Sequence, residues 1–214
     1  MRYYATASGP RVAEAIDAGL LGMIASPAAG NLVRPGWHWC ADNNCYTGRY
    51  PGDQAYLRWL HRHTVHVDRC AFATAPDVVA DAAATLARSV PILGPIRALG
   101  YPAALVFQDG IEHLPIPWDE FDVAFLGGST TWKLGPAASD LAAEARRRGT
   151  PVHLGRVNSL RRLHHAARIG ATSVDGTLLA FGPDRHLPRL LRWLQQIQPS
   201  PTGATAPAAS DGPL

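Results

Sequence analysis

Eight short apolar runs constrain the fold of this chain more than any other feature of its sequence. Most of them stop at a small or acidic residue, and a segment rich in alanine, leucine and arginine usually follows. Alternating strand-like and helix-like segments are typical of βα units around a parallel sheet. The predicted strands are Tyr3–Thr6, Leu21–Ala25, Trp37–Ala41, Cys70–Ala73, Ala103–Phe107, Val123–Leu126, Val152–Leu154 and Ser173–Val174. Eight parallel strands close a barrel, so the sequence predicts a compact (β/α)8 TIM-type barrel of the α/β class.

The segments between the runs predict helices with recognisable ends. Ser8 is suited to cap the first helix, and Gly149 and Gly170 to end two later ones, because glycine adopts the left-handed conformation that stops a helix. The predicted helices are Pro10–Ala18, Asp53–His63, Val78–Ser89, Pro136–Arg148, Ser159–Ile169 and Leu187–Gln196. We expect one domain over residues 1–197, with some helices short or missing, because such barrels typically take about 250 residues. Residues 198–214 are rich in Pro, Ala, Ser and Gly, which predicts a disordered tail.

Composition and charge exclude several classes of protein. Hydrophobic residues make up 47% and charged residues 17% of the chain, as in soluble globular proteins. No apolar run approaches the roughly 20 residues that cross a membrane, so no membrane partner is expected. The N-terminal MRYYATASGP lacks the regions of a secretory signal, and three cysteines do not make a disulfide framework. We therefore expect a cytoplasmic protein.

The basic residues are almost all arginine, with Lys133 as the sole lysine and a net charge of +3. Arginine makes planar, bidentate contacts with phosphate. The base composition of a genome can also produce an arginine bias. The charge therefore permits a nucleic-acid partner without establishing one.

Four of the apolar runs end in carboxylates, which are Asp42, Asp77, Asp109 and Asp175. A parallel barrel gathers the carboxyl ends of its strands on one face, where catalytic residues lie. Asp175 follows the last predicted strand beside Gly176, where aspartate can act as a nucleophile on an anomeric carbon. The alternative for Asp175 is an Asp-Gly turn that only shapes a loop. The pattern as a whole predicts an enzyme built around carboxylates.

Four further strand ends carry polar or small residues with a structural alternative each. Asp77 follows Pro76 and is equally suited to cap the predicted helix after it. Gln108 and Asp109 place an amide beside a carboxylate, which is the equipment for reading the edge of a heterocyclic base, or form a simple turn. The remaining candidates are Gly127 and Gly128, which admit a flat ligand or form an ordinary loop, and Asp42, whose neighbours Asn43 and Asn44 also favour a turn.

The segments ADNNCY, FATAPD, VFQDG, FLGGS, HLGRVNSLRRL and SVDG occur in this order along the chain. This series resembles the tRNA-guanine transglycosylase superfamily, and most closely its short phage and bacterial members, which insert 7-deazaguanine bases into DNA. The resemblance covers roughly residues 37–180. It implies that Asp175 attacks the anomeric carbon of a guanosine and that the covalent intermediate is captured by a 7-deazaguanine.

The same resemblance implies a role for each of the other strand ends. Asp77 would hold the amidine edge of the base, and Gln108 with the N–H of Gly128 would meet its carbonyl oxygen. Asp42 would move protons, since separate environments can tune two carboxylates to different tasks. Asp109 and Gly127 complete the expected base site as neighbours of Gln108 and Gly128.

The chain departs from the family in two places. The tRNA-modifying members bind structural zinc through cysteines after the nucleophile, and no cysteine follows Asp175 here. The family's serine- and glycine-rich loop is replaced by NNCYTG, in which Tyr46 stands in for a base-stacking aromatic. The missing segment favours DNA over tRNA as the substrate by analogy with the short members.

An enzyme that acts on a base in DNA must flip it out or bind single strands, so aromatic and basic residues are expected near the barrel mouth. Arg161 and Arg162 also fit a solvated helix surface. The residues expected to bind nucleic acid are Trp132, Lys133, Arg156 and Arg185.

The spacing of the cysteines does not favour a metal site. Cys40 and Cys45 lack the close C-x2-C spacing of zinc sites, so buried thiols, including Cys70, are favoured over a metal.

We therefore expect an enzyme that exchanges guanine in DNA for a 7-deazaguanine, such as the 7-cyano form, and that needs no cofactor. Three rival hypotheses remain open from the sequence. They are a tRNA-guanine transglycosylase, a metal-dependent barrel phosphoesterase or sugar isomerase, and a nucleic-acid-binding barrel without turnover.

Overall fold

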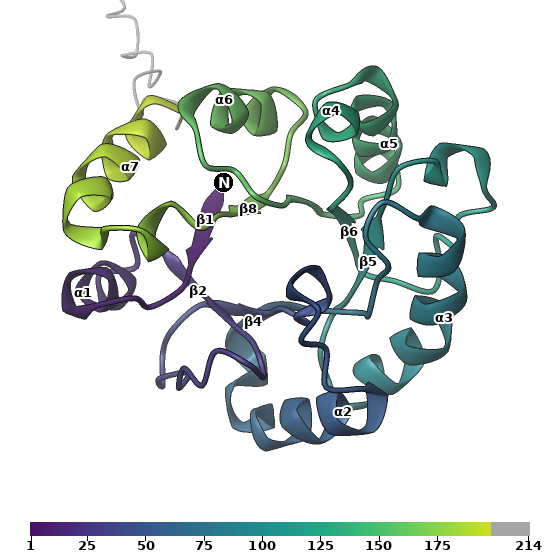
Figure 1. The fold of residues 1–214 in the computed structure, drawn as a ribbon, viewed down its shortest axis with the longest axis horizontal. Helices are drawn as coiled ribbons and strands as arrows, with labels where there is room; N and C mark the ends of the chain where they lie inside the picture. Colours follow the sequence, from purple (N-terminus) through teal and green to yellow (C-terminus); the bar gives the residue numbers. More distant parts are fainter. Residues whose placement is uncertain (198–214) are drawn as a thin grey trace, which may run out of the picture.

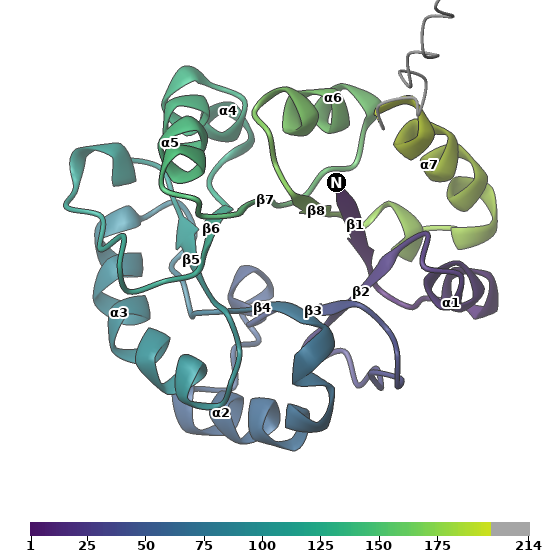
Figure 2. The ribbon, with the colours of Figure 1, turned by 180° about the vertical axis from the view of Figure 1, so that it is seen from behind.

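Eight parallel strands form a closed barrel, in sequence order, in the computed structural model, which describes residues 1–197 (Figures 1 and 2). The strands are β1 (Arg2–Ala5), β2 (Gly22–Ala25), β3 (Trp39–Ala41), β4 (Cys70–Thr74), β5 (Ala103–Phe107), β6 (Val123–Leu126), β7 (Val152–Leu154) and β8 (Ser173–Asp175). The predicted fold class is confirmed, and every strand lies within two residues of its expected ends. The expected disordered tail lies outside the described residues.

Helices surround the barrel on the outside, as Figure 1 shows. They are α1 (Pro10–Asp17), α2 (Asp53–Arg62), α3 (Ala82–Ala98), α4 (Thr130–Lys133), α5 (Pro136–Arg147), α6 (Leu160–Arg168) and α7 (Pro183–Ile197). Single 3-10 turns are η1 (Cys45–Thr47), η2 (Thr64–Arg69), η3 (Ile111–His113) and η4 (Leu178–Ala180). No helix lies between β2 and β3, where residues 26–38 form a loop. This missing helix contributes to the small size of the barrel.

Alternate side chains of the strands point to opposite sides of the barrel wall. Those that point outward pack against the helices and form the main hydrophobic core. Those that point inward form a second, smaller cluster of buried residues, which includes Tyr4, Cys40, Phe72, Ala104 and Val123. This inner cluster fills the lower part of the barrel, and a cavity lies above it at the mouth.

The start of α3 differs from the prediction. Asp81, and not Asp77, caps this helix, because its side chain accepts a hydrogen bond from the N–H of Ala84 at 2.9 Å. Val78 is held in the preceding turn by two hydrogen bonds with the Thr85 hydroxyl. The capping alternative for Asp77 is therefore wrong. The helix also continues to Ala98 through two prolines that lie on its exposed side, where water can bind the carbonyls that they leave free.

Other helix ends confirm or correct the expectations. Gly149 (φ 75°) and Gly170 (φ 74°) follow α5 and α6 in the left-handed conformation, as predicted. Ser8 does not cap α1; its hydroxyl donates to the carbonyl oxygen of Leu179 at 2.8 Å, and Gly9 stands at the cap position. The short α4 was not predicted, and α7 begins four residues earlier than expected, at Pro183.

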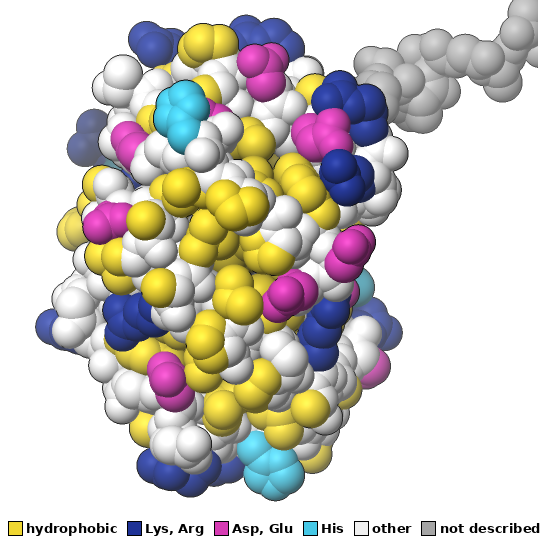
Figure 3. Space-filling view, turned by 90° about the vertical axis from the view of Figure 1, so that its right-hand side faces the viewer, with side chains coloured by type: hydrophobic (Ala, Val, Ile, Leu, Met, Phe, Trp, Pro, Cys, Tyr) yellow, Lys and Arg dark blue, Asp and Glu magenta, His cyan; other side chains and the backbone are white. Residues whose placement is uncertain are grey.

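Charge is distributed unevenly over the surface. Figure 3 shows the side of the molecule that lies at the right of Figure 1, around α3, and its side chains are mostly apolar with scattered charges. Helices α6 and α7, which pack against each other, carry the arginines Arg161, Arg162, Arg168, Arg185, Arg189 and Arg192. Within residues 1–197, no helix is both long and apolar enough to cross a membrane.

Candidate active site

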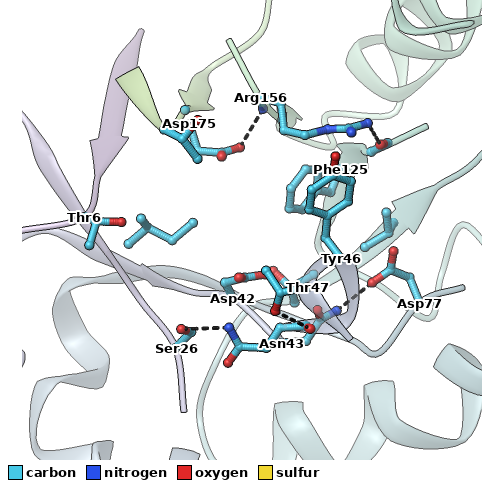
Figure 4. Close-up of a pocket in the computed structure, with 18 of the residues that line it drawn as sticks. Thr6, Ser26, Asp42, Asn43, Tyr46, Thr47, Asp77, Phe125, Arg156 and Asp175 are labelled. Atoms are coloured by element: carbon cyan, nitrogen blue, oxygen red, sulfur yellow. Dashed lines mark hydrogen bonds between the residues drawn. The ribbon is translucent and has the colours of Figure 1, made fainter. Parts of the chain in front are cut away.

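A cavity of about 520 Å³ opens at the carboxyl ends of the strands. This volume lies in the range of small-molecule sites. Several residues singled out from the sequence line it, namely Asp42, Tyr46, Asp77, Gln108, Gly127, Arg156 and Asp175 (Figure 4). They come from strand ends all around the barrel, because parallel strands place their carboxyl ends on one face.

Asp175 is the last residue of β8, and its side chain points into the cavity (Figure 4). Its Oδ1 accepts hydrogen bonds from Nε2 of His153, at 3.1 Å, and from the backbone N–H of Arg156, at 3.2 Å. The side chain is 14% exposed, so it remains accessible from the cavity. One oxygen of the Asp175 carboxylate is thus hydrogen-bonded within the protein, and the side chain has a fixed orientation. His153 was not predicted from the sequence as a site residue.

Asp42 lies after β3 and lines the same cavity. Burial, together with the charges of Asp175 and Asp77, raises the pKa of Asp42 to about 7, although the backbone N–H groups of Asn44 and Asn43 oppose this shift. A carboxyl with this pKa is partly protonated at neutral pH. The cavity therefore combines a proton-carrying carboxyl with the hydrogen-bonded carboxylate of Asp175.

The raised pKa of Asp42 predicts a dependence of stability on pH. The folded protein binds more protons than the unfolded chain between the ordinary value of 3.8 and about 7, so the free energy of unfolding falls as the pH rises through this window. We expect Asp42→Asn to raise the free energy of unfolding at pH 8 by about 2–4 kcal/mol, and to change it little at pH 4. Urea denaturation of both proteins at the two pH values measures this. An equal difference in the free energy of unfolding between the two proteins at pH 4 and at pH 8 would contradict the raised pKa of Asp42.

Asp77 and Gln108 form a buried polar pair on the other side of the cavity. Oδ2 of Asp77 accepts from Nε2 of Gln108 at 2.7 Å, and Oδ1 accepts from Nδ2 of Asn43 at 2.9 Å. Oε1 of Gln108 accepts from the N–H of Ala80 at 3.0 Å, which fixes the orientation of the amide. Burial raises the pKa of Asp77, and the bonds from Asn43 and Gln108 oppose this shift. Asp77 is thus held in place with lone pairs left for a ligand.

The Asn pair after Asp42 shapes the loop as well as the site. Asn44 adopts the left-handed conformation (φ 65°), and its side chain binds the N–H of Ala28 and the hydroxyl of Ser26. Asn43 holds Asp77, as described above. The turn expected as the alternative for Asp42 is therefore present, and it coexists with the exposure of Asp42 to the cavity.

The wall and floor of the cavity are suited to a flat apolar ring. Ile24, Val106 and the ring of Phe125 line it from three strands. Thr74 also lines it, and its buried hydroxyl has no hydrogen-bond partner among the described residues. That hydroxyl is available to a polar atom of a ligand.

Arg156 closes one side of the cavity. Its backbone is left-handed (φ 62°), and its guanidinium donates to the carbonyl oxygens of Gly127 and Gly128 at 3.1 and 2.7 Å. The same guanidinium lies over the ring of Tyr46, 4.4 Å from its centre, although Tyr46 is 61% exposed. Residues from two opposite sides of the mouth are therefore in contact.

Both backbone N–H groups of the glycine pair are used within the protein. The N–H groups of Gly127 and Gly128 both donate to the carbonyl oxygen of Phe107, at 3.0 and 3.1 Å. Only Gly127 lines the cavity. The expectation that the Gly128 N–H meets a ligand is corrected, because this amide is used within the protein.

Three predicted contact residues lie in a supporting layer behind the cavity. Asp109 accepts from the N–H and the hydroxyl of Ser129, both at 2.6 Å, and Trp132 donates to Glu112. Lys133 is only 4% exposed and donates to the carbonyl oxygen of Gly155 at 2.7 Å. None of the three lines the cavity.

Lys133 also differs from its expected place at a nucleic-acid contact. The expectation for Lys133 is wrong, because burial, aided by the charge of Arg156, lowers its pKa to about 7 and leaves no exposed cation. Arg185 is exposed on α7 and does not line the cavity, and its contact with nucleic acid stays a prediction.

The cysteines are free thiols. Cys40 and Cys70 are buried, and burial raises the pKa of the partly buried Cys45 to about 12. Within residues 1–197, no group of three or more His, Cys, Asp or Glu side chains is arranged to hold a metal ion.

Comparisons with known proteins bear on the fold. No protein-family model matches the chain, and no curated protein matches it. Among solved structures, it is similar to phosphoribosyl anthranilate isomerase from Thermus thermophilus, with 15% identity, coverage of 92% of this chain and 100% of that one, and a TM-score of 0.57. It is also similar to the Bacillus subtilis YkuI protein, which has an EAL domain and was solved with its substrate c-di-GMP and calcium. That match has 16% identity, covers 87% of this chain and 46% of that one, and has a TM-score of 0.46. At these identities the likeness concerns the barrel fold alone.

Proposed function

We propose that this protein is a base-exchange enzyme of the transglycosylase type, which replaces guanine in DNA with a 7-deazaguanine such as 7-cyano-7-deazaguanine. The observation that carries the proposal is the pair of unlike carboxylates in one cavity. Asp175 is held by two hydrogen bonds, whereas burial raises the pKa of Asp42 to about 7. A nucleophile and a proton carrier are the two groups that exchange at an anomeric carbon requires.

The exchange proceeds in two displacements at C1′ of the deoxyribose. In the first, an oxygen of Asp175 forms a bond to C1′, and the bond from C1′ to guanine N9 breaks. Its electron pair goes to the guanine, which takes a proton from the carboxyl of Asp42. In the second, the incoming base gives its N9 proton to Asp42, and N9 bonds to C1′. The electron pair of the ester bond then returns to Asp175.

The buried pair of Asp77 and Gln108 supports a guanine-like base. The edge of guanine that carries N1–H and the exocyclic amino group presents two donors, and a carboxylate accepts both. Nε2 of Gln108 donates one hydrogen to Asp77 and keeps another for the carbonyl oxygen of the base. The aromatic rings of Phe125 and Tyr46 in the cavity lining supply faces for the flat ring system.

DNA is the polymer that we propose, with the protein acting in the cytoplasm. This choice follows the short members of the family that the sequence resembles, and it is an analogy. The arginines of α6 and α7 offer an electrostatic surface for phosphates.

One assay tests the proposal directly. The protein is incubated with guanine-labelled DNA and, in parallel, with guanine-labelled tRNA, while candidate 7-deazaguanines are added with and without a chelator. We expect the DNA to lose its label only when a deazaguanine is present, and to the same extent with chelator. Loss from tRNA alone would overturn the choice of polymer. Binding of DNA without any release would favour a barrel without turnover, and loss that depends on a metal would favour another barrel chemistry.

A further inference from the structure

The two oxygens of Asp175 have different surroundings. Oδ1 accepts both hydrogen bonds, from Nε2 of His153 and from the N–H of Arg156, and no described residue donates to Oδ2. Figure 4 shows the bond from the backbone N–H of Arg156 to one oxygen of this carboxylate. Hydrogen bonds lower the nucleophilicity of the oxygen that accepts them. Oδ2 is therefore the atom that is free to react.

His153 is held rigidly inside the barrel. Its side chain is 0% exposed, and its ring packs against Phe72 and Phe125 with centroid distances of 4.8 and 4.5 Å. The other ring nitrogen, Nδ1, lies 2.8 Å from the hydroxyl of Ser173. A buried imidazole with a partner at each nitrogen and aromatic rings around it has one orientation available.

The hydrogen-bond pattern also fixes which nitrogen carries the hydrogen. A carboxylate only accepts, so Nε2 of His153 must donate to Asp175. In a neutral imidazole Nδ1 is then an acceptor, and the Ser173 hydroxyl, which can rotate, donates to it. Ser173 thus orients His153, and His153 orients Asp175. Ser173 and Asp175 lie two residues apart on β8, so both point into the barrel.

The second donor to Oδ1 depends on an uncommon backbone conformation. Arg156 is left-handed (φ 62°), which is rare for a residue with a side chain. This conformation directs its N–H to Asp175 while its guanidinium binds the carbonyl oxygens of Gly127 and Gly128. The strain is thus offset by contacts on both sides of the residue.

We propose that His153 and Ser173 are positioning residues that make Oδ2 of Asp175 the attacking atom; this inference rests on the proposed base exchange. During attack the bond forms between Oδ2 and C1′, and Oδ1 becomes the carbonyl oxygen of the ester. When the second base displaces the ester, the negative charge returns to the carboxylate, and His153 and the Arg156 N–H stabilise it. His153 and Ser173 therefore act in both half-reactions without touching the substrate.

Three variants separate this role from simple packing. His153→Phe keeps a ring among the aromatic side chains but removes the hydrogen-bond donor to Asp175. We expect kcat to fall about 10- to 100-fold, which corresponds to the loss of one hydrogen bond to a charged group. The KM values for DNA and for the base should not change. His153→Gln keeps an N–H near the position of Nε2, and we expect it to restore kcat to within about 10-fold of the natural protein. Ser173→Ala removes the partner of Nδ1 but keeps the donor at Nε2, so it should lower kcat by less than His153→Phe.

Tyr101→Phe serves as the matched control. It removes another buried hydrogen bond, from Tyr101 to the carbonyl oxygen of Leu60 at 2.9 Å, outside the cavity. We expect it to lower thermal stability without changing kcat or KM. Thermal unfolding of every variant shows which of them fold.

The outcomes distinguish the two proposals. If the natural protein exchanges bases and folded His153→Phe has an unchanged kcat, or if His153→Gln loses as much as His153→Phe, the positioning role is overturned. If the natural protein exchanges no base, the proposed function fails, and the positioning role falls with it. A crystal structure of the trapped adduct gives a second readout: we expect the ester carbonyl oxygen beside His153 and the sugar on the other oxygen. The reverse arrangement would contradict the proposal even if His153→Phe does not fold.

Discussion

Asp175→Asn is expected to abolish base exchange while the barrel keeps its fold. The amide has almost the shape of the carboxylate and still offers an oxygen to His153 and the Arg156 N–H. It has no anionic oxygen to form the bond to C1′, so we expect a loss of at least about 10⁴-fold in kcat. Release of labelled guanine from DNA measures the rate. Mass spectrometry after denaturation shows whether a protein–DNA adduct forms, which we expect only for the natural protein.

Asp122→Asn is the control for this experiment. Asp122 lies before β6, at the opposite end of the barrel, where its carboxylate binds Arg97 and the N–H of Ala103. We expect this variant to lose stability and to keep its exchange rate. Exchange at an undiminished rate by Asp175→Asn would remove Asp175 from the reaction. A similar loss in both variants would indicate damage to the fold instead.

Asp77→Asn is expected to change which base the protein accepts. Asn presents one acceptor and one donor where Asp presents two acceptors, so it mismatches the amino group of a guanine-like base. We expect kcat/KM for a 7-deazaguanine to fall about 10²- to 10³-fold, because a site that loses a buried hydrogen bond rejects its ligand strongly. The corresponding 7-deazaxanthine carries a carbonyl in place of the amino group and matches the new amide.

Competition between the two bases, labelled differently, measures this preference. We expect the ratio of incorporation to shift towards the deazaxanthine in Asp77→Asn. Part of the loss will be structural, because Asn43 and Gln108 both donate to Asp77 and one of them would face the new amino group. The ratio of the two bases is free of that effect, since both use the same folded protein. An unchanged ratio would show that Asp77 does not read the base edge.

The strands could be predicted from the sequence because their signals are local. Runs such as ALVF and VAFL are short, apolar and followed directly by polar or small residues, and a strand buried on both sides has this pattern. The start of α3 could not be predicted in this way. Asp77 and Asp81 are both good caps, and only the contact between Val78 and Thr85 favours the second.

The candidate site was predictable where it depends on strand ends. Asp42, Asp77, Gln108 and Asp175 line one cavity, because a parallel barrel places these ends together. His153 and Lys133 were missed or misplaced for a different reason. A strand of three residues is too short to show which side chain points inward, so the burial of His153 was not visible in the sequence. The burial of Lys133 depends on the short α4, which propensity does not reveal.

The closure of the barrel has a consequence for how the site assembles. β8 pairs with β1, and Asp175 lies opposite Tyr4 in this pairing. The residue at the carboxyl end of the last strand is therefore held by one of the first residues of the chain. A shorter product that stops before β8 would contain Asp77 and Gln108 but would lack Asp175 and the strand that closes the barrel. During synthesis, the two ends of the chain must thus meet before the candidate site is complete.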